Sequence, residues 1–277
     1  ENNTLPLEEQ KRAIQANINE LVRQRNALKE TTTGGFNVAL GTQALLNNTT
    51  GQSNIAIGQL ALGNNTSADD NVAIGQDALV LNYTGHSNVA IGSYALDAAN
   101  TNNNTAVGHQ AMTNATASEC VAVGSRALKA HTSGARNSAL GSEAATAVTT
   151  ANDITAIGRS CLAACTTGDS NTALGSKSLM ACTTGTGNVV IGKSAGDVIT
   201  TGSYNTLAGL NAAGALTTGT HNTVLGNNTA SALTAGTNNT IVGSSVLVAG
   251  DGADNCSAVG YAALYSNTAD NINTFGY

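Results

Sequence analysis

The side chains that could support catalysis or hold a metal ion are few in this chain, and they are scattered. No H-E-x-x-H metal-binding motif is present. Asp69-Asp70 and the pair Asp251 and Asp254 could offer oxygen ligands to Ca²⁺, but no EF-hand or GGxGxD pattern surrounds them. We therefore expect no enzyme, no cofactor and no metal site. The four histidines, which lie far apart along the chain, are His86, His109, His131 and His221.

The cysteines do not form a metal-binding pattern either, because no C-x-x-C pair occurs among the five. Cys165 and Cys182 are 17 residues apart. If the chain repeats with that period, the two side chains lie one above the other, within the range of a disulfide. The alternative is that each cysteine replaces a small buried residue.

A short phrase ending in glycine organises the chain. It reads NVALG at 37–41, NIAIG at 54–58 and NVAIG at 71–75, and it returns every 17 residues apart from two steps of 16. A period this regular predicts an all-β solenoid of about 14 coils. We expect the glycines to allow a bend that other residues do not. They are Gly41, Gly58, Gly75, Gly92, Gly108, Gly124, Gly141, Gly158, Gly175, Gly192, Gly209, Gly226, Gly243 and Gly260.

The composition fits a thin rod better than a globule. Aromatic residues make up 3% and charged residues 10% of the 277, and there is no tryptophan. Such a chain cannot build a thick core, but small residues can stack closely along an axis. The net charge of −6 argues against a nucleic-acid partner, and no apolar run is long enough to span a membrane.

Within each phrase, V-A-I reads as a strand whose side chains alternate between two apolar faces. A strand facing water would carry one polar face, so we expect this strand to lie between its own core and a sister chain. The face that carries the small alanine side chains would allow a neighbouring chain to approach more closely. This predicts a homotrimer in which Ala39, Ala56, Ala73 and Ala90 face the neighbouring chains.

The rest of each coil follows from its residues. The Ala-Leu step after the glycine predicts a second strand that places leucine in the core. The T-T-G stretch predicts an outer turn. The asparagine four residues before eleven of the fourteen glycines predicts a ladder of stacked amides along the rod.

Residues 1–33 precede the repeat, which we assign to 34–277. The segment is rich in helix-forming residues. A heptad seam of Leu7, Ile14, Ile18, Leu21 and Leu28 predicts a short oligomerising coiled coil. The alternative is a helix that caps the first coil.

The N-[STV]-x-A-[IVL]-G phrase resembles the head repeats of trimeric autotransporter adhesins and the repeats of phage-type tail fibres. The resemblance implies a left-handed β-roll, a side-by-side homotrimer and a place on a virion or cell surface. It implies a fibre or adhesin whose outer loops contact a receptor or glycan. The alternatives are a subunit of a self-assembling filament or a passive stalk, with end-to-end contacts to further copies, and, more weakly, an ice-binding threonine face. Adhesin heads commonly have a period shorter than 17, so the coil shape can differ.

Overall fold

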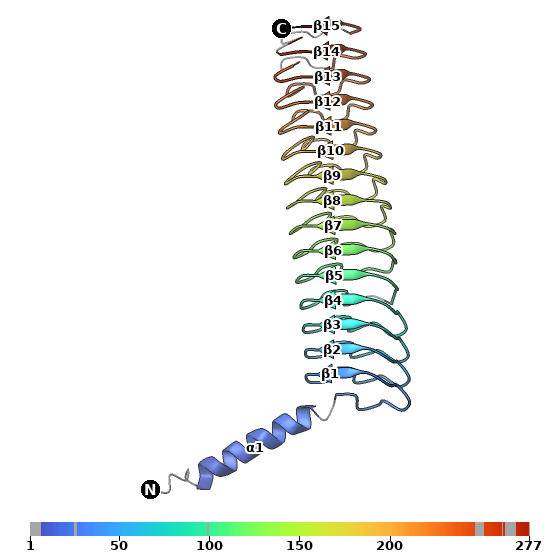
Figure 1. Cartoon of the computed structure of the whole chain (residues 1–277), viewed down its shortest axis with the longest axis vertical. Coiled ribbons are helices and arrows are strands. Elements are labelled where there is room, and N and C mark those ends of the chain that lie inside the picture. Colours follow the sequence, from blue (N-terminus) through green and yellow to red (C-terminus); the bar gives the residue numbers. More distant parts are fainter. Residues whose placement is uncertain are drawn as a thin grey trace.

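The structure is a computed structural model, and it describes residues 7–24, 27–98, 100–246, 252–261, 263 and 270–276, without the side chains of residues 7, 16 and 18–24. One helix, α1 (Leu7–Gln24), precedes a column of short strands (Figure 1). The strands are β1 (Val38–Leu40), β2 (Ile55–Ile57), β3 (Val72–Ile74), β4 (Val89–Ile91), β5 (Thr105–Val107), β6 (Val121–Val123), β7 (Ser138–Leu140), β8 (Thr155–Ile157), β9 (Thr172–Leu174), β10 (Val189–Ile191), β11 (Thr206–Ala208), β12 (Thr223–Leu225), β13 (Thr240–Val242), β14 (Ser257–Val259) and β15 (Asn273–Phe275).

All the strands form one parallel sheet in chain order, and each strand between β1 and β15 pairs with the strands before and after it. The register follows the repeat, so that Val72 pairs with Val89 and Ala73 with Ala90. The predicted solenoid and its period are confirmed. Figure 1 shows the result as a rod, with one strand of every coil in a single line and the connecting turns on either side.

The glycine that ends each phrase forms the corner after the strand. Gly141 has φ +138°, in a region that side chains rarely adopt, and a Cβ there would lie 2.6 Å from the carbonyl oxygen of Gly158. Both the backbone conformation and the close approach of the next coil therefore require glycine. The same holds along the whole column of repeat glycines, whose φ values run from +130° to +143°.

The alanines of the strands point into the coil, which corrects the predicted trimer-facing role. Ala56, Ala73 and Ala90 are completely buried within their own chain, and Ala39 of the first strand is partly buried against the same core. Ala56, Ala73 and Ala90 therefore cannot contact a sister chain. The core of each coil is divided between two positions: a strand alanine accompanies the leucine after the corner, whereas the larger Leu207 and Val224 accompany the smaller Ala213 and Ala230.

That leucine is buried as predicted, but it does not belong to a second strand. Leu45, Leu62 and Leu79 are completely buried, and all three have positive φ, from +48° to +52°. The segment is a tight turn that brings the chain back over its own strand. Core burial, worth about 1.5–3 kcal/mol for a leucine, offsets the cost of the left-handed backbone.

The asparagine ladder is confirmed. Asn188 Nδ2 donates to Asn171 Oδ1 (3.0 Å) and to the carbonyl of Gly202 (2.9 Å). Asn188 Oδ1 in turn accepts the backbone N–H of Asn205 (3.0 Å). Each amide thus connects three successive coils, and it satisfies polar groups that are buried.

The N-terminal helix ends earlier than the predicted seam. Leu28 lies beyond α1 and packs on the solenoid core, and its N–H donates to the carbonyl of Ala44 (3.2 Å). Glu30 and Thr32 also bond to the first full coil. Leu28 is therefore not a coiled-coil residue, and the stack begins before residue 34. Ile14 is 58% exposed, while the side chains of Leu7, Ile18 and Leu21 lie outside the described residues.

Candidate interaction surface

The residues with catalytic or metal-binding chemistry are not brought together by the fold. In the described part of the chain, no three His, Cys, Asp or Glu side chains lie close enough to share a metal ion. Asp251 is outside that part. Asp69, Asp169 and Asp254 instead serve the backbone, since each Oδ1 accepts an N–H of the preceding coil at 2.7 Å.

One stretch that the sequence analysis overlooked is GNVVIGKS at 187–194, which has the letters of a phosphate-binding P-loop and overlaps a G-x-S-x-G at 192–196. In a P-loop, a strand precedes the motif and a helix follows it. Here β10 (Val189–Ile191) lies inside the motif, and a turn of the repeat follows Gly192. The match therefore arises from the repeat and forms no phosphate cradle.

The cysteines are buried free thiols. Cys165 and Cys182 occupy equivalent places in neighbouring coils, and each Sγ contacts a carbonyl of its own coil, at 3.5 and 3.6 Å. Burial raises the pKa of Cys182 to about 12 and that of Cys161 to about 11. Such thiols hold little thiolate at neutral pH, so they act as core residues.

His131 is the one histidine placed in the core. It occupies the position that asparagine takes in other coils, as at Asn48 and Asn65, and its Nε2 lies 3.0 Å from Asn137 Nδ2. Within the described residues, Nδ1 has no hydrogen-bond partner. Burial lowers the pKa of His131, and the carbonyl of Gly134 opposes part of that shift.

The most extended surface feature is a row of aliphatic side chains on the outer side of the sheet. Because the alanines point inward, the residues three and one before each repeat glycine point outward. Leu40 is 57% exposed, Leu140 50% and Ile191 45%. We call this set the outer aliphatic face; its most exposed members are Val38, Leu40, Ile55, Ile91, Val121, Leu140, Ile157, Leu174, Val189, Ile191 and Leu225.

This face is unusual for a water-exposed surface. Parallel sheets are normally covered on both sides, and soluble monomers rarely expose contiguous apolar patches of this kind. The outer aliphatic face extends from β1 to β10 as a continuous line of stacked strands, although threonine or serine replaces its first aliphatic position in some coils. Thr206 and Ala208 interrupt it at β11, and Leu225 of β12 resumes it. Among the residues that the structure describes, it is the strongest sign of an interface.

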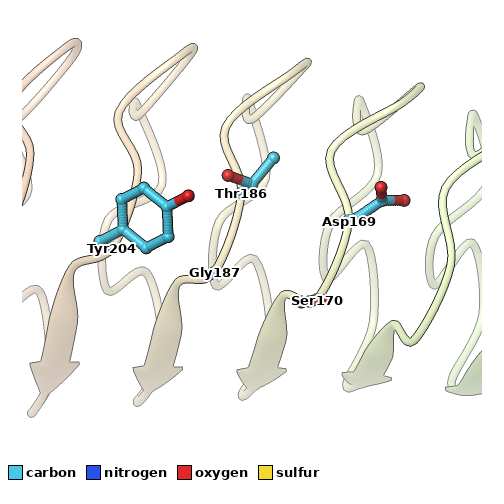
Figure 2. A pocket seen from close by; sticks show the side chains of 5 residues that line it. All are labelled: Asp169, Ser170, Thr186, Gly187 and Tyr204. Atoms are coloured by element: carbon cyan, nitrogen blue, oxygen red, sulfur yellow. The ribbon is translucent and has the colours of Figure 1, made fainter.

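A shallow hollow lies beside this face, just before the start of the strands. It has a volume of about 260 Å³ and is lined by Asp169, Ser170, Thr186, Gly187 and Tyr204. Figure 2 shows the Tyr204 ring leaning toward the coil of Thr186 and Gly187. Gly187 makes this possible, because a Cβ there would lie 2.8 Å from Tyr204 Cδ1. The Tyr204 ring also stacks on His221, with centroids 5.0 Å apart.

The chain matches no protein-family model and no curated protein, and no solved structure matches it. Among the described residues, no helix has the length and apolar character needed to cross a membrane. The function must therefore be argued from the surface itself.

Proposed function

We propose that the protein is a structural fibre or adhesin rod, built from three parallel copies that pack side by side through the outer aliphatic face. The exposure of that face along the rod carries the proposal. Burying it against sister chains removes apolar surface from water, at roughly 25 cal/mol per Å². This would explain why both faces of the strand are apolar. The alanines lie in the core, and the aliphatic side chains would lie at the interface between chains.

The resemblance to adhesin heads and tail-fibre repeats supports three copies, a left-handed coil and a location on a cell or virion surface. In such a rod the T-T-G turns remain on the outside. A repeated outer surface gives many weak contacts, which together bind a receptor or glycan by avidity. Catalysis is not part of this proposal, and α1 would add a coiled coil at the N-terminal end.

Light scattering on the purified chain tests the association. We expect a mass three times the 27.5 kDa of one chain. Leu140→Asp combined with Leu174→Asp should reduce the mass to that of one chain, because a trimer would bury these two carboxylates. The matched control is Val198→Asp, an exposed aliphatic residue away from the face, which should leave the trimer unchanged.

A single-chain mass for the unaltered protein would refute the proposal. Association that withstands the double substitution would mean that another surface joins the chains. Long periodic filaments in negative-stain images would favour the alternative of a self-assembling filament.

A further inference from the structure

A rod of near-identical coils has a problem of axial register. The outer aliphatic face looks almost the same after a shift of one coil, about 4.8 Å. Apolar packing alone would therefore allow sister chains to slip along one another. A slipped contact does not close after three copies, and it leads to open assemblies. A trimer of this chain needs a feature that distinguishes one coil from the next.

Two columns of mostly exposed or half-buried side chains flank the outer aliphatic face. The leading column consists of the residues five before each repeat glycine, where the chain approaches the strand. The trailing column consists of the residues one or two after it, where the chain leaves the strand. The two columns lie at opposite ends of every strand, so the aliphatic face separates them.

Basic residues are confined to a short part of the rod. Residues 34–277 contain only Arg126, Lys129, Arg136, Arg159, Lys177 and Lys193 as lysines and arginines. The coils before and after that part carry acidic side chains without basic ones. The charges that could distinguish coils therefore lie in the middle of the solenoid.

Three successive coils, those of Gly124, Gly141 and Gly158, carry a pattern in both columns. The leading column reads Glu119, Arg136, Asp153. In the trailing column Arg126 and Glu143 come two residues after their glycine, and Arg159 comes one residue after its own, since the second residue there is the buried Ser160. The sign alternates along each column, and in every one of the three coils the two columns have opposite signs.

Contacts inside the chain explain the alternation along each column. Arg136 Nε and Nη2 donate to the Asp153 carboxylate at 2.7 and 2.9 Å, and Arg126 pairs with Glu143. The hydrogen bond between Arg136 and Asp153 raises the pKa of the arginine and lowers that of the carboxyl. These contacts do not require the two columns to be opposite in sign, because the columns lie at different ends of the strand.

An assembly of parallel chains around one axis would require the two columns to be opposite in sign. Rotation about an axis along the rod brings the leading edge of one chain to the trailing edge of its neighbour at the same height. We propose that Glu119, Arg136 and Asp153 of one chain pair with Arg126, Glu143 and Arg159 of the next, and that this charge clasp sets the axial register of the trimer. The inference rests on the proposed side-by-side association.

The clasp also opposes slippage. A shift of one coil brings Glu119 opposite Glu143 and Arg136 opposite Arg159 in one direction. In the other direction it brings Arg136 opposite Arg126 and Asp153 opposite Glu143. Every such pair has like charges, and like charges across an interface disfavour the wrong arrangement. The aligned register is the one that keeps all three pairs attractive.

The hollow lies two coils beyond the Gly158 coil, and it offers a further contact between the leading and trailing columns. In the coil of Gly192, the leading residue is Gly187 and the trailing residue is Lys193, which is exposed. The missing side chain at Gly187 opens space beside Asp169 and Tyr204. A neighbouring Lys193 can extend into that space, near a carboxylate and an aromatic ring. One coil opposes the pattern, since that of Gly75 carries Asp70 and Asp77, both acidic.

Reversing whole columns tests the clasp without disturbing the pairs inside the chain. The leading variant is Glu119→Arg, Arg136→Glu, Asp153→Arg, and the trailing variant is Arg126→Glu, Glu143→Arg, Arg159→Glu. Each keeps the alternation within its column but makes every pair between chains repulsive. The variant with both columns reversed makes every pair attractive again. Circular dichroism checks that all four proteins fold alike.

We expect either single-column variant to dissociate at a concentration about tenfold or more above that of the native protein, as measured by sedimentation at low salt. The doubly reversed protein should regain native association. Raising the salt to about 0.5 M should reduce the differences, because the charges are exposed. Equal association of all four proteins would overturn the clasp and leave the trimer standing. A native protein that is monomeric throughout would overturn both.

Discussion

At the scale of single residues, the repeat glycines are the strictest requirement of the fold. Gly141 combines a positive φ with a coil-to-coil approach that leaves no room for a Cβ. Gly141→Ala should therefore lower the free energy of unfolding by about 3 kcal/mol, because the alanine must either strain its own backbone or separate two coils. Urea denaturation followed by circular dichroism measures the change.

Gly35→Ala is the matched control for that substitution. A Cβ at Gly35 meets nothing within 4 Å, and its backbone is not left-handed. This variant should be as stable as the native protein. A loss of stability at Gly35 as large as that at Gly141 would contradict the steric explanation.

His131 should make the stability depend on pH. Burial lowers its folded-state pKa below the ordinary 6.5, so the unfolded chain binds a proton that the folded chain excludes. The contribution of His131 is fully present above about pH 6.5, and it is lost as the pH falls below that value toward the folded pKa. The slope of the unfolding free energy against pH between 7 and 5 measures this.

His131→Asn provides the comparison, since asparagine occupies the same position at Asn48 and Asn65. The variant should lose the part of the slope that comes from the histidine and remain folded. An unchanged slope in His131→Asn would show that other groups cause the acid sensitivity.

At the scale of the elements, each strand is too short to be stable without the coils above and below it. The asparagine ladder connects those coils from inside. Asn188→Ala removes two donated hydrogen bonds and leaves the carbonyl of Gly202 and the N–H of Asn205 without their partner. The expected loss is about 2 kcal/mol or more, because unsatisfied buried polar groups are costly.

Hydrogen exchange can locate this effect. The amides of β10 and β11 should exchange faster in Asn188→Ala, while those of β2 and β3 keep their native rates, since coils interact only with their neighbours. Faster exchange throughout the rod would mean that the solenoid unfolds as one cooperative unit.

The sequence predicts an element well where the residue at a repeat position can serve only one structural purpose. The glycine period defines the coils, and the stacked asparagines are predicted from their position alone. The alternation in V-A-I shows that a strand has two apolar faces, but it does not show which face is inside. That depends on how the strand residue and the residue after the turn share the core: Ala73 is buried with Leu79, whereas Leu207 is buried with the smaller Ala213.

The N-terminal boundary of the solenoid can be predicted from the sequence, but the heptad pattern of the helix overlaps it. Ala27-Leu28 stands 17 residues before Ala44-Leu45 and so belongs to the repeat. Leu28 also falls seven residues after Leu21, and this coincidence extended the heptad seam into the solenoid. The glycine-based alignment missed it, because Gln24 occupies the place of the glycine in that first partial coil.

At the scale of the whole molecule, the exposed face and the charged columns belong to one account of assembly. In the proposed trimer the aliphatic side chains would provide the driving force for association, and they cannot choose a register because they repeat. The charges provide little driving force at an exposed site, but they differ from coil to coil. Substitutions on the face should abolish association, whereas reversing one column of charges should weaken the aligned trimer without abolishing it.

The arrangement also explains the placement of the hollow. Asp169 and Tyr204 lie beside the leading edge of the sheet and not on the outer turns. In the proposed trimer they adjoin a neighbouring chain. Receptor contacts would then fall on the T-T-G turns, which stay on the outside of the assembly.

The most direct test of this account is a cross-section of the intact particle by cryo-electron microscopy. We predict three parallel solenoids around one axis, with Leu140, Leu174 and the rest of the outer aliphatic face turned toward that axis. A single solenoid with this face in contact with water, or an assembly joined through another side of the coil, would contradict it.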